Sequence, residues 1–327
     1  MKLISSFSVL NLVCFSLLVF MSPASAETDN ACVRADGAIL IDSSKFGTDS
    51  DPNQAGLQPS VVEDIDGNLG ASCKEIPDGY KVTFYRMAMC TSNPILNSNS
   101  LDGCTLLLND DNGVEHLIEG TNNAAVLDTS SADTPIASGS YTFLALILSN
   151  ELQIKHLEEF IDQNGDPRTL IGETGVGSYC WTNDAITTFT GTLQDADYPD
   201  GTIVSSDPND RSTLGMDCGA TPGTPQFATE IYDNFGQGAF AAIEPGSQQA
   251  ILLASDNVTT AISAANAKRI LVAMPLTAEV TPSSQFDLKF TLTRSVSIDM
   301  HLDENSGSVT ALKNGADPFS VSLTVTN

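Results

Sequence analysis

Two stretches of alternating apolar residues constrain the fold of this chain most, because the second repeats the pattern of the first. The patterns are Leu144-x-Leu146-x-Leu148-Ser149-x-x-Leu152-x-Ile154 and Leu288-x-Phe290-x-Leu292-Thr293-x-x-Val296-x-Ile298. Alternation at period two is typical of a half-buried β-strand, and a small hydroxyl residue followed by two polar positions interrupts it. Each stretch therefore predicts a strand, a kink or tight turn, and a second strand. We expect Leu146 and Phe290 to face the core.

The remaining apolar runs predict an all-β protein, a two-layer antiparallel sandwich or jelly-roll-like fold with long loops and at most one or two short helices. Further strands are predicted at 80–90, 105–108, 114–118 and 319–326. The stretch 109–113, Asn-Asp-Asp-Asn-Gly, predicts a hairpin turn. The best helix candidate is 256–265, which Asp256 would cap at its N-terminus.

The chain begins with a stretch that has the features of a signal peptide. Lys2 supplies the positive charge, residues 9–20 the apolar segment, and Ala24-Ser25-Ala26 the small residues of a cleavage site. An uncleaved anchor is the alternative, although the apolar part is short for a bilayer span of about 20 residues. We expect the mature chain to start at Glu27 and to be exported, to the cell surface, the extracellular space or the periplasm.

The order of strands and loops predicts how the mature chain is divided. We expect a first β half at 27–193, an irregular loop or linker at 194–226, and a second β half at 227–327. The two halves could pack as one domain or form two.

The charge balance excludes some partners. The chain has 14 basic and 41 acidic residues, and loss of 1–26 removes only Lys2, which leaves a net charge of −28. Such a field repels nucleic acid and anionic lipid, because binding a phosphate backbone requires Lys and Arg. Solubility in a salty medium is an alternative reason for the acidity. No later stretch is apolar enough to span a membrane as a helix.

Six of the seven cysteines lie after the signal segment. They are Cys32, Cys73, Cys90, Cys104, Cys180 and Cys218. An even number in an exported chain predicts disulfides, and six cysteines allow 15 pairings. We expect nearest neighbours to pair, because Cys90 and Cys104 bracket a polar loop after a strand.

The motifs between Tyr80-Lys-Val-Thr and Tyr179-Cys-Trp-Thr182, with Cys90-Thr, Cys104 and Gly139-x-Tyr141 between them, resemble a group of exported β-rich proteins of unassigned role from aquatic bacteria. The resemblance covers about residues 80–182. It implies a β-rich fold and no activity.

Catalytic motifs are not recognisable in the sequence, so no catalytic residue and no nucleotide cofactor is predicted. The three histidines are not in H-E-x-x-H spacing, and no G-x-S-x-G or G-x-G-x-x-G occurs. His156 and His301 follow the two repeated patterns, where strand ends are expected. Paired carboxylates for glycoside hydrolysis remain an alternative among the 41 acidic residues, because their spacing is set by the fold.

Calcium is the candidate ligand that the sequence suggests most specifically. Asp162, Asn164, Asp166 and Glu173 occupy positions 1, 3, 5 and 12 of an EF-hand-like loop. Position 6 holds Pro167, whose fixed φ does not allow the turn that glycine makes there.

Two shorter oxygen-rich turns are also candidate calcium sites. They are Asp64, Asp66 and Asn68, and the 109–113 stretch. Ordinary Asx turns are the alternative for these two segments.

Together these features predict a non-catalytic exported structural, surface-assembly or adhesive protein. Its expected partners are further copies of itself or a cell-surface or extracellular component. The alternatives are a secreted hydrolase that uses paired carboxylates and a calcium-dependent glycan-binding module.

Overall fold

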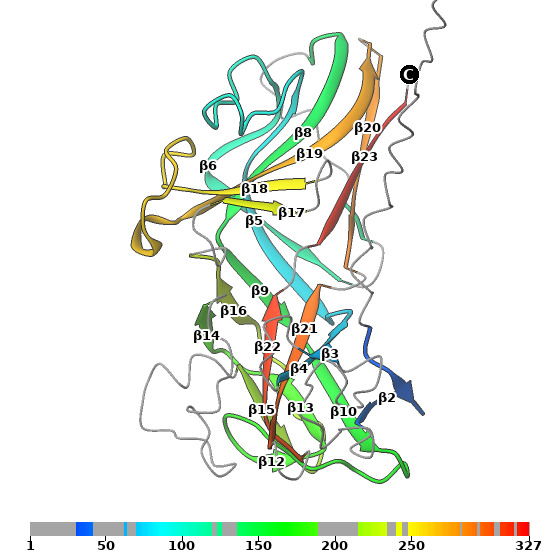
Figure 1. Ribbon diagram of the computed structural model, residues 1–327. Helices are drawn as coiled ribbons and strands as arrows, with labels where there is room; N and C mark the ends of the chain where they lie inside the picture. The colour runs from blue at the N-terminus through cyan, green and yellow to red at the C-terminus, as the bar shows by residue number, and fades with distance from the viewer. Residues whose placement is uncertain are drawn as a thin grey trace, which may run out of the picture.

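Strands make up nearly all of the regular structure of this protein (Figure 1). The computed structural model describes residues 31–41, 62–63, 70–119, 123–125, 136–188, 215–233, 240–243, 248–281, 283–292, 295–303, 308–316 and 319–326. In these ranges there is no α-helix, and the one helical turn is a 3₁₀ helix, η5 (Ala264–Asn266). The expected all-β class is confirmed.

The largest sheet has nine strands and runs through most of the molecule's length (Figure 1). Its strands are β5 (Gly79–Cys90), β6 (Thr105–Ile118), β8 (Gly139–Ser149), β9 (Glu151–Lys155), β14 (Ile186–Thr188), β16 (Ala228–Ile231), β17 (Phe240–Ile243), β18 (Gln248–Leu253) and β19 (Arg269–Val280). Their order is β14-β16-β9-β5-β8-β19-β18-β17, and β6 pairs with β5 as well.

In the upper half of Figure 1, this sheet packs against a second sheet of three strands. These are β20 (Gln285–Thr291), β23 (Ser320–Thr326) and β7 (Asn123–Ala125), with β20 in the middle. We call β5–β8, β17–β20 and β23 the upper half. Its core is large and apolar, with aromatic contacts such as Phe84–Phe290 at 5.3 Å between ring centroids.

The lower half contains the other sheets. Its strands, besides β9, β14 and β16, are β1 (Arg34–Ala35), β2 (Ala38–Ile41), β3 (Val62–Glu63), β4 (Gly70–Glu75), β10 (Leu157–Asp162), β11 (Leu170–Ile171), β12 (Val176–Gly177), β13 (Tyr179–Thr182), β15 (Met216–Gly219), β21 (Val296–Asp303) and β22 (Ser308–Ala316). They form sheets in the orders β1-β2-β10-β13-β15, β22-β21-β4-β3 and β11-β12. The five-stranded sheet is mixed, because β10 pairs parallel with β2 and antiparallel with β13.

The lower core lies between strands of the five-stranded and four-stranded sheets. It contains two disulfides, Cys32–Cys73 and Cys180–Cys218, beside apolar residues such as Ile39, Phe160 and Ile298. The third disulfide, Cys90–Cys104, lies in the upper half. The predicted pairing of nearest neighbours is confirmed. Three disulfides indicate an oxidising environment, extracellular or periplasmic.

The first repeated pattern forms the strand, kink and strand that the sequence predicts, and the second forms the two predicted strands, with residues 293–294 between them outside the described residues. The first gives β8 and β9 and the second gives β20 and β21, so each pair runs from the upper half into the lower half (Figure 1). At the first kink Asn150 is buried, and its Nδ2 donates to the carbonyl oxygens of Tyr232 at 3.0 Å and Ala267 at 3.1 Å. Leu146 and Phe290 are both buried in the upper core, as expected.

The predicted hairpin turn at 109–113 is wrong. Both flanking segments belong to β6 and pair with the same strand, β5, so Asp110 to Gly113 form a bulge within β6. The Asp110 carboxylate accepts from the backbone N–H of Asn112 and Gly113, which is the local bond pattern of a turn. Gly113 has a φ of +80°, and a Cβ there would lie 2.5 Å from Cγ2 of Thr83. The residue pattern predicts the local turn correctly, but it does not show that both flanking segments pair with β5.

The predicted helix at 256–265 is also wrong, since this segment is a loop between β18 and β19 that ends in η5. Asp256 does cap backbone N–H groups, those of Val258 and Thr259, but as a turn. Asn257 has a φ of +65°, and Thr260 forms a bridge with Leu253. β-Branched residues at 258–260 favour this extended return over a helix.

Strands of the two predicted halves share sheets. The nine-stranded sheet combines β5, β8 and β9 with β16 to β19, and β15, from the segment predicted as a linker, pairs with β13. The C-terminal strand is confirmed as β23 and pairs antiparallel with β20. The signal segment 1–26 and residues 189–214 lie outside the described residues.

Candidate functional site

Two loops cover the outer face of the nine-stranded sheet in the upper half. The disulfide loop, residues 91–104, leaves the end of β5 at Cys90 and is closed by Cys104. The second loop, residues 254–268, connects β18 to β19. Beneath them lies a small apolar cluster that includes Ala145, Ile147 and Leu271, on the face of the sheet opposite the upper core. Alternation along β8 places Ala145 and Ile147 outward, since Leu146 points into the core, and Leu271 of β19 lies opposite Ile147.

Asparagine side chains hold the two loops in place. Asn93 Nδ2 donates to Gln249 Oε1 at 2.7 Å, and Asn93 Oδ1 accepts from the backbone N–H of Ile95. Asn99, which is buried and has a φ of +59°, donates through Nδ2 to Thr260 Oγ1 at 2.9 Å and to the Val258 carbonyl oxygen at 3.3 Å. The disulfide loop and the second loop are therefore tied to each other as well as to the sheet.

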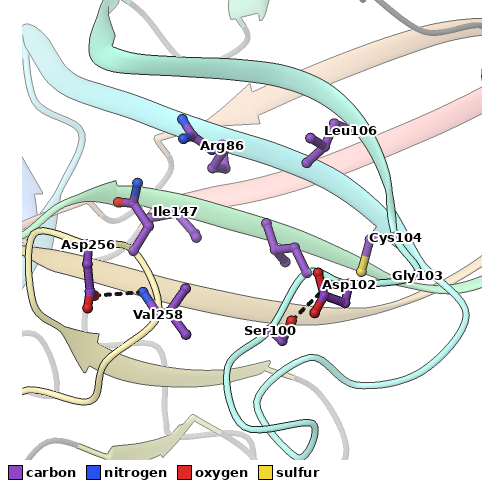
Figure 2. Close-up of a pocket in the computed structure, with 11 residues that line it drawn as sticks. Arg86, Ser100, Asp102, Gly103, Cys104, Leu106, Ile147, Asp256 and Val258 are labelled. Carbon is purple, nitrogen blue, oxygen red and sulfur yellow. Dashed lines mark hydrogen bonds between the residues drawn. The ribbon is translucent and has the colours of Figure 1, made fainter.

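A pocket of about 400 Å³ lies between the two loops (Figure 2). Leu106 and Ile147 contribute apolar side chains to its lining, and Arg86 of β5 lines it as well. The Arg86 guanidinium forms an ion pair with Asp111 and donates to the Tyr85 carbonyl oxygen at 2.8 Å. The positive charge of Arg86 is therefore already balanced by a carboxylate of the β6 bulge.

Figure 2 shows a carboxylate at each end of this pocket, one from each loop. Asp102 belongs to the disulfide loop, where its backbone N–H donates to Ser100 Oγ at 3.0 Å. Asp256 belongs to the second loop, where the Thr259 hydroxyl and the backbone N–H groups of Val258 and Thr259 donate to its carboxylate. These hydrogen bonds lower the pKa of Asp256, the one from the Thr259 hydroxyl most. Among the described residues neither carboxylate has a cationic partner.

The protonation of Asp256 and the apolar lining bear on what this pocket can hold. A general acid needs a carboxyl whose pKa is raised, whereas the pKa of Asp256 is lowered. The described lining residues include no histidine or other base in contact with the Ser100 hydroxyl. An apolar floor with separated negative ends can hold a side chain that is aliphatic along its length and positively charged at its tip.

No motif in the sequence points to these pocket residues. Asp256 was interpreted as a helix cap and Asp102 as part of a polar loop. The disulfide bracket at Cys90 and Cys104 was the available signal, because it predicted a closed loop beside a strand. The disulfide loop lies next to residues 254–268 because β8 pairs with β19, and these two strands are more than 100 residues apart in the sequence.

The EF-hand-like residues lie at the end of β10 and in the segment that follows it. Asp162 Oδ1 accepts from the backbone N–H of Asn164 at 2.8 Å and of Asp166 at 2.9 Å. These bonds lower the pKa of Asp162 and form an Asx turn. Glu173 is bonded elsewhere, since its Oε2 accepts from Asn183 Nδ2 at 2.8 Å.

Calcium binding stays a prediction. Within the described ranges, no group of three or more His, Cys, Asp or Glu side chains is arranged to hold a metal ion. Asp64, Asp66 and Asn68 lie outside the described residues. In the 109–113 stretch, Asp110 and Asp111 are used by the bulge and by Arg86.

A second polar cluster lies in the lower half, where Glu158 and His156 are buried and Arg34 is exposed. Glu158, on β10, forms an ion pair with Arg34, which also reaches Glu75 at 3.0 Å. Burial acts to lower the pKa of Arg34, but the hydrogen bonds and charges of Glu158 and Glu75 outweigh it and raise that pKa. His156 Nε2 lies 2.9 Å from Glu158 Oε1, with the ring turned so that no hydrogen bond forms. The ion pairs of this cluster join β1, β4 and β10 and so stabilise the lower half.

Comparisons with known proteins return no match, whether to a family model, a curated protein or a solved structure. The resemblance to exported β-rich proteins of aquatic bacteria therefore stays a prediction. Within the described ranges, no helix has the length and apolar character needed to cross a membrane. The class that the fold defines is an all-β protein with three disulfides.

Proposed function

We propose that this protein is a non-catalytic, exported structural protein that works in surface assembly or adhesion. The observation that carries the proposal is the pair of kinked ribbons, β8–β9 and β20–β21, which run through both halves of the molecule. A chain whose halves are joined by two pairs of successive strands resists being pulled apart at a linker. Three disulfides add covalent closure to each half, as suits a protein that works outside the cell.

We also infer that each half is a two-layer sandwich. The upper core draws side chains from the nine-stranded and three-stranded sheets, and the lower core from the five-stranded and four-stranded sheets. Packed layers of this kind are the usual way in which sheets bury one face. The loops at their edges are then free to carry binding surfaces.

A secreted hydrolase is the second candidate, because Asp102 and Asp256 line one pocket. Their places at opposite ends and the lowered pKa of Asp256 count against it. A calcium-dependent glycan-binding module stays a sequence prediction that the described residues do not favour over the others.

Immunogold electron microscopy of the native cells, combined with a hydrolysis screen of the purified protein, tests the proposal. Label on the outer surface or in extracellular material, with no release of sugars or peptides, is the expected result. Turnover of a polysaccharide that Asp102→Asn and Asp256→Asn abolish would replace the proposal with the hydrolase.

A further inference from the structure

The two loops that frame the pocket also expose aliphatic side chains. Leu96 of the disulfide loop is 79% exposed, and Val258 and Ile262 of the second loop are 49% and 87% exposed. The Asn99 hydrogen bonds tie the two loops together beside Val258. We call Leu96, Val258, Ile262 and the pocket with Asp102 and Asp256 the loop surface.

We propose that the loop surface docks a protein segment in which a lysine or arginine lies beside aliphatic residues. This inference rests on the proposed function and names the chemistry of the partner. The partner's aliphatic residues would contact Leu96, Val258 and Ile262. Its cationic side chain would lie along Leu106 and Ile147 with its charge at one of the two carboxylates.

Charge complementarity selects this partner over a second copy of the chain. The net charge of the chain is −27, so two copies repel each other, while a basic segment is attracted. Asp102 and Asp256 have no cationic partner among the described residues, and the Arg86 charge is balanced by Asp111. The surface is also preorganised, since a disulfide and the asparagine bonds fix both loops before binding, which lowers the entropic cost.

Two other classes of ligand fit less well. Membrane-surface segments combine apolar residues with Lys or Arg. In the pocket lining the one cation, Arg86, is paired with Asp111, and the remaining charged groups are carboxylates that anionic lipid repels. Sugar and base platforms rely on aromatic faces, and the described lining of the pocket contains no aromatic residue.

Fluorescence anisotropy with defined peptides tests the inference on the full, disulfide-bonded protein. The probes are labelled peptides of alternating leucine and lysine, leucine and glutamate, or serine and lysine. The leucine–lysine peptide should bind at least about tenfold more tightly than the other two, a difference of about 1.4 kcal/mol. Its affinity should also fall as salt is raised, because screening weakens the contact with the carboxylates.

Matched variants separate docking from general attraction to an acidic protein. Ile262→Ser and Asp102→Asn should weaken binding of the leucine–lysine peptide about tenfold and threefold. The same changes at exposed residues of the lower half, Ile186→Ser and Asp184→Asn, should leave it unchanged. Thermal melts of all four variants check that each remains folded.

Several results would overturn the inference. One is that the leucine–lysine peptide does not bind. Another is that the loop-surface variants and the lower-half variants weaken its binding equally. Sedimentation that shows a dimer lost on Ile262→Ser would assign the surface to a second copy, and binding to phosphatidylcholine vesicles would assign it to lipid. None of these results depends on where the protein is found or on whether it hydrolyses a substrate, so the proposed function is tested separately.

Discussion

The upper and lower halves of this protein are held together by different means. The upper core is built from aliphatic and aromatic side chains, and its disulfide, Cys90–Cys104, closes a loop outside that core. The lower core is smaller, contains two disulfides, and has a buried ionic cluster beside it. A sheet that cannot bury much apolar surface needs covalent bonds to stay folded. One chain thus stabilises its upper half by burial of apolar side chains and its lower half by disulfide cross-links.

A charge placed in the upper core should give the largest effect. Phe290→Asp puts a carboxylate among Phe84 and other buried side chains, so we expect a loss of about 5 kcal/mol or failure to fold. Leu146→Asp should behave alike. Ser322→Asp is the control, since Ser322 is exposed on β23 and lies opposite Lys289. Urea unfolding measures all three, and a Phe290→Asp protein as stable as the control would contradict the account of the upper core.

Loss of a lower-half disulfide should come next. Cys180 and Cys218 are 38 residues apart, so removal of both thiols as Cys180→Ala and Cys218→Ala should cost about 4 kcal/mol by the loop-closure relation. Cys90→Ala with Cys104→Ala opens a loop of 14 residues and should cost about 3 kcal/mol. Denaturant midpoints of the two double variants give the ranking, and a reversed order would mean that the lower core does not depend on its cross-links.

The buried ionic cluster should give a moderate effect. Glu158→Gln leaves the Arg34 guanidinium short of a charge partner, and because Arg34 is partly exposed we expect a loss of about 2 kcal/mol. The matched control in the upper half is Glu115→Gln, which removes an exposed partner of Lys81 and should cost less than about 0.5 kcal/mol. Equal losses from the two changes would show that the cluster is no more important than a surface pair.

The smallest effect concerns pH. His116 is half-buried on β6, with its ring 5.4 Å from that of Phe290, and burial lowers its pKa below 6.5. The unfolded chain takes up this proton first as pH falls, so His116 should make stability decrease below about pH 6.5 until its folded pKa is reached. Thermal melts between pH 5 and 8 should show a shallower decrease for His116→Gln. Parallel curves for the two proteins would mean that His116 titrates alike in both states.

The sequence predicted the parts of the fold that depend on local periodicity. Leu144 to Ile154 and Leu288 to Ile298 have apolar residues at every second position on either side of a break, which predicts their strands and the side of each strand that faces the core. Each disulfide joins two cysteines that are nearest neighbours in the sequence, one of the 15 pairings that six cysteines allow. The parts that failed depend on distant partners. Asp110 and Gly113 have the same turn chemistry in a hairpin as in a bulge, and only the pairing of both flanks with β5 decides between them.

The candidate site could not be predicted for the same reason. Asp256 makes the bonds of an N-cap whether a helix or a β-turn follows, and Asn257 at positive φ ends the helical option. Asp102 and Ile262 have no local signal at all. The two loops that carry them are joined where Asn99 donates to Thr260, a contact between segments that are distant in sequence.

Hydrogen exchange of the Cys180→Ala, Cys218→Ala protein tests the difference between the halves most directly. Mass spectrometry compares its amide protection with that of the unchanged protein under native conditions. We expect β10, β13 and β15 to lose protection while β5, β8 and β19 keep it. Loss of protection in both halves together, or in neither, would contradict the claim that the lower half is held by its cross-links and the upper half by its core.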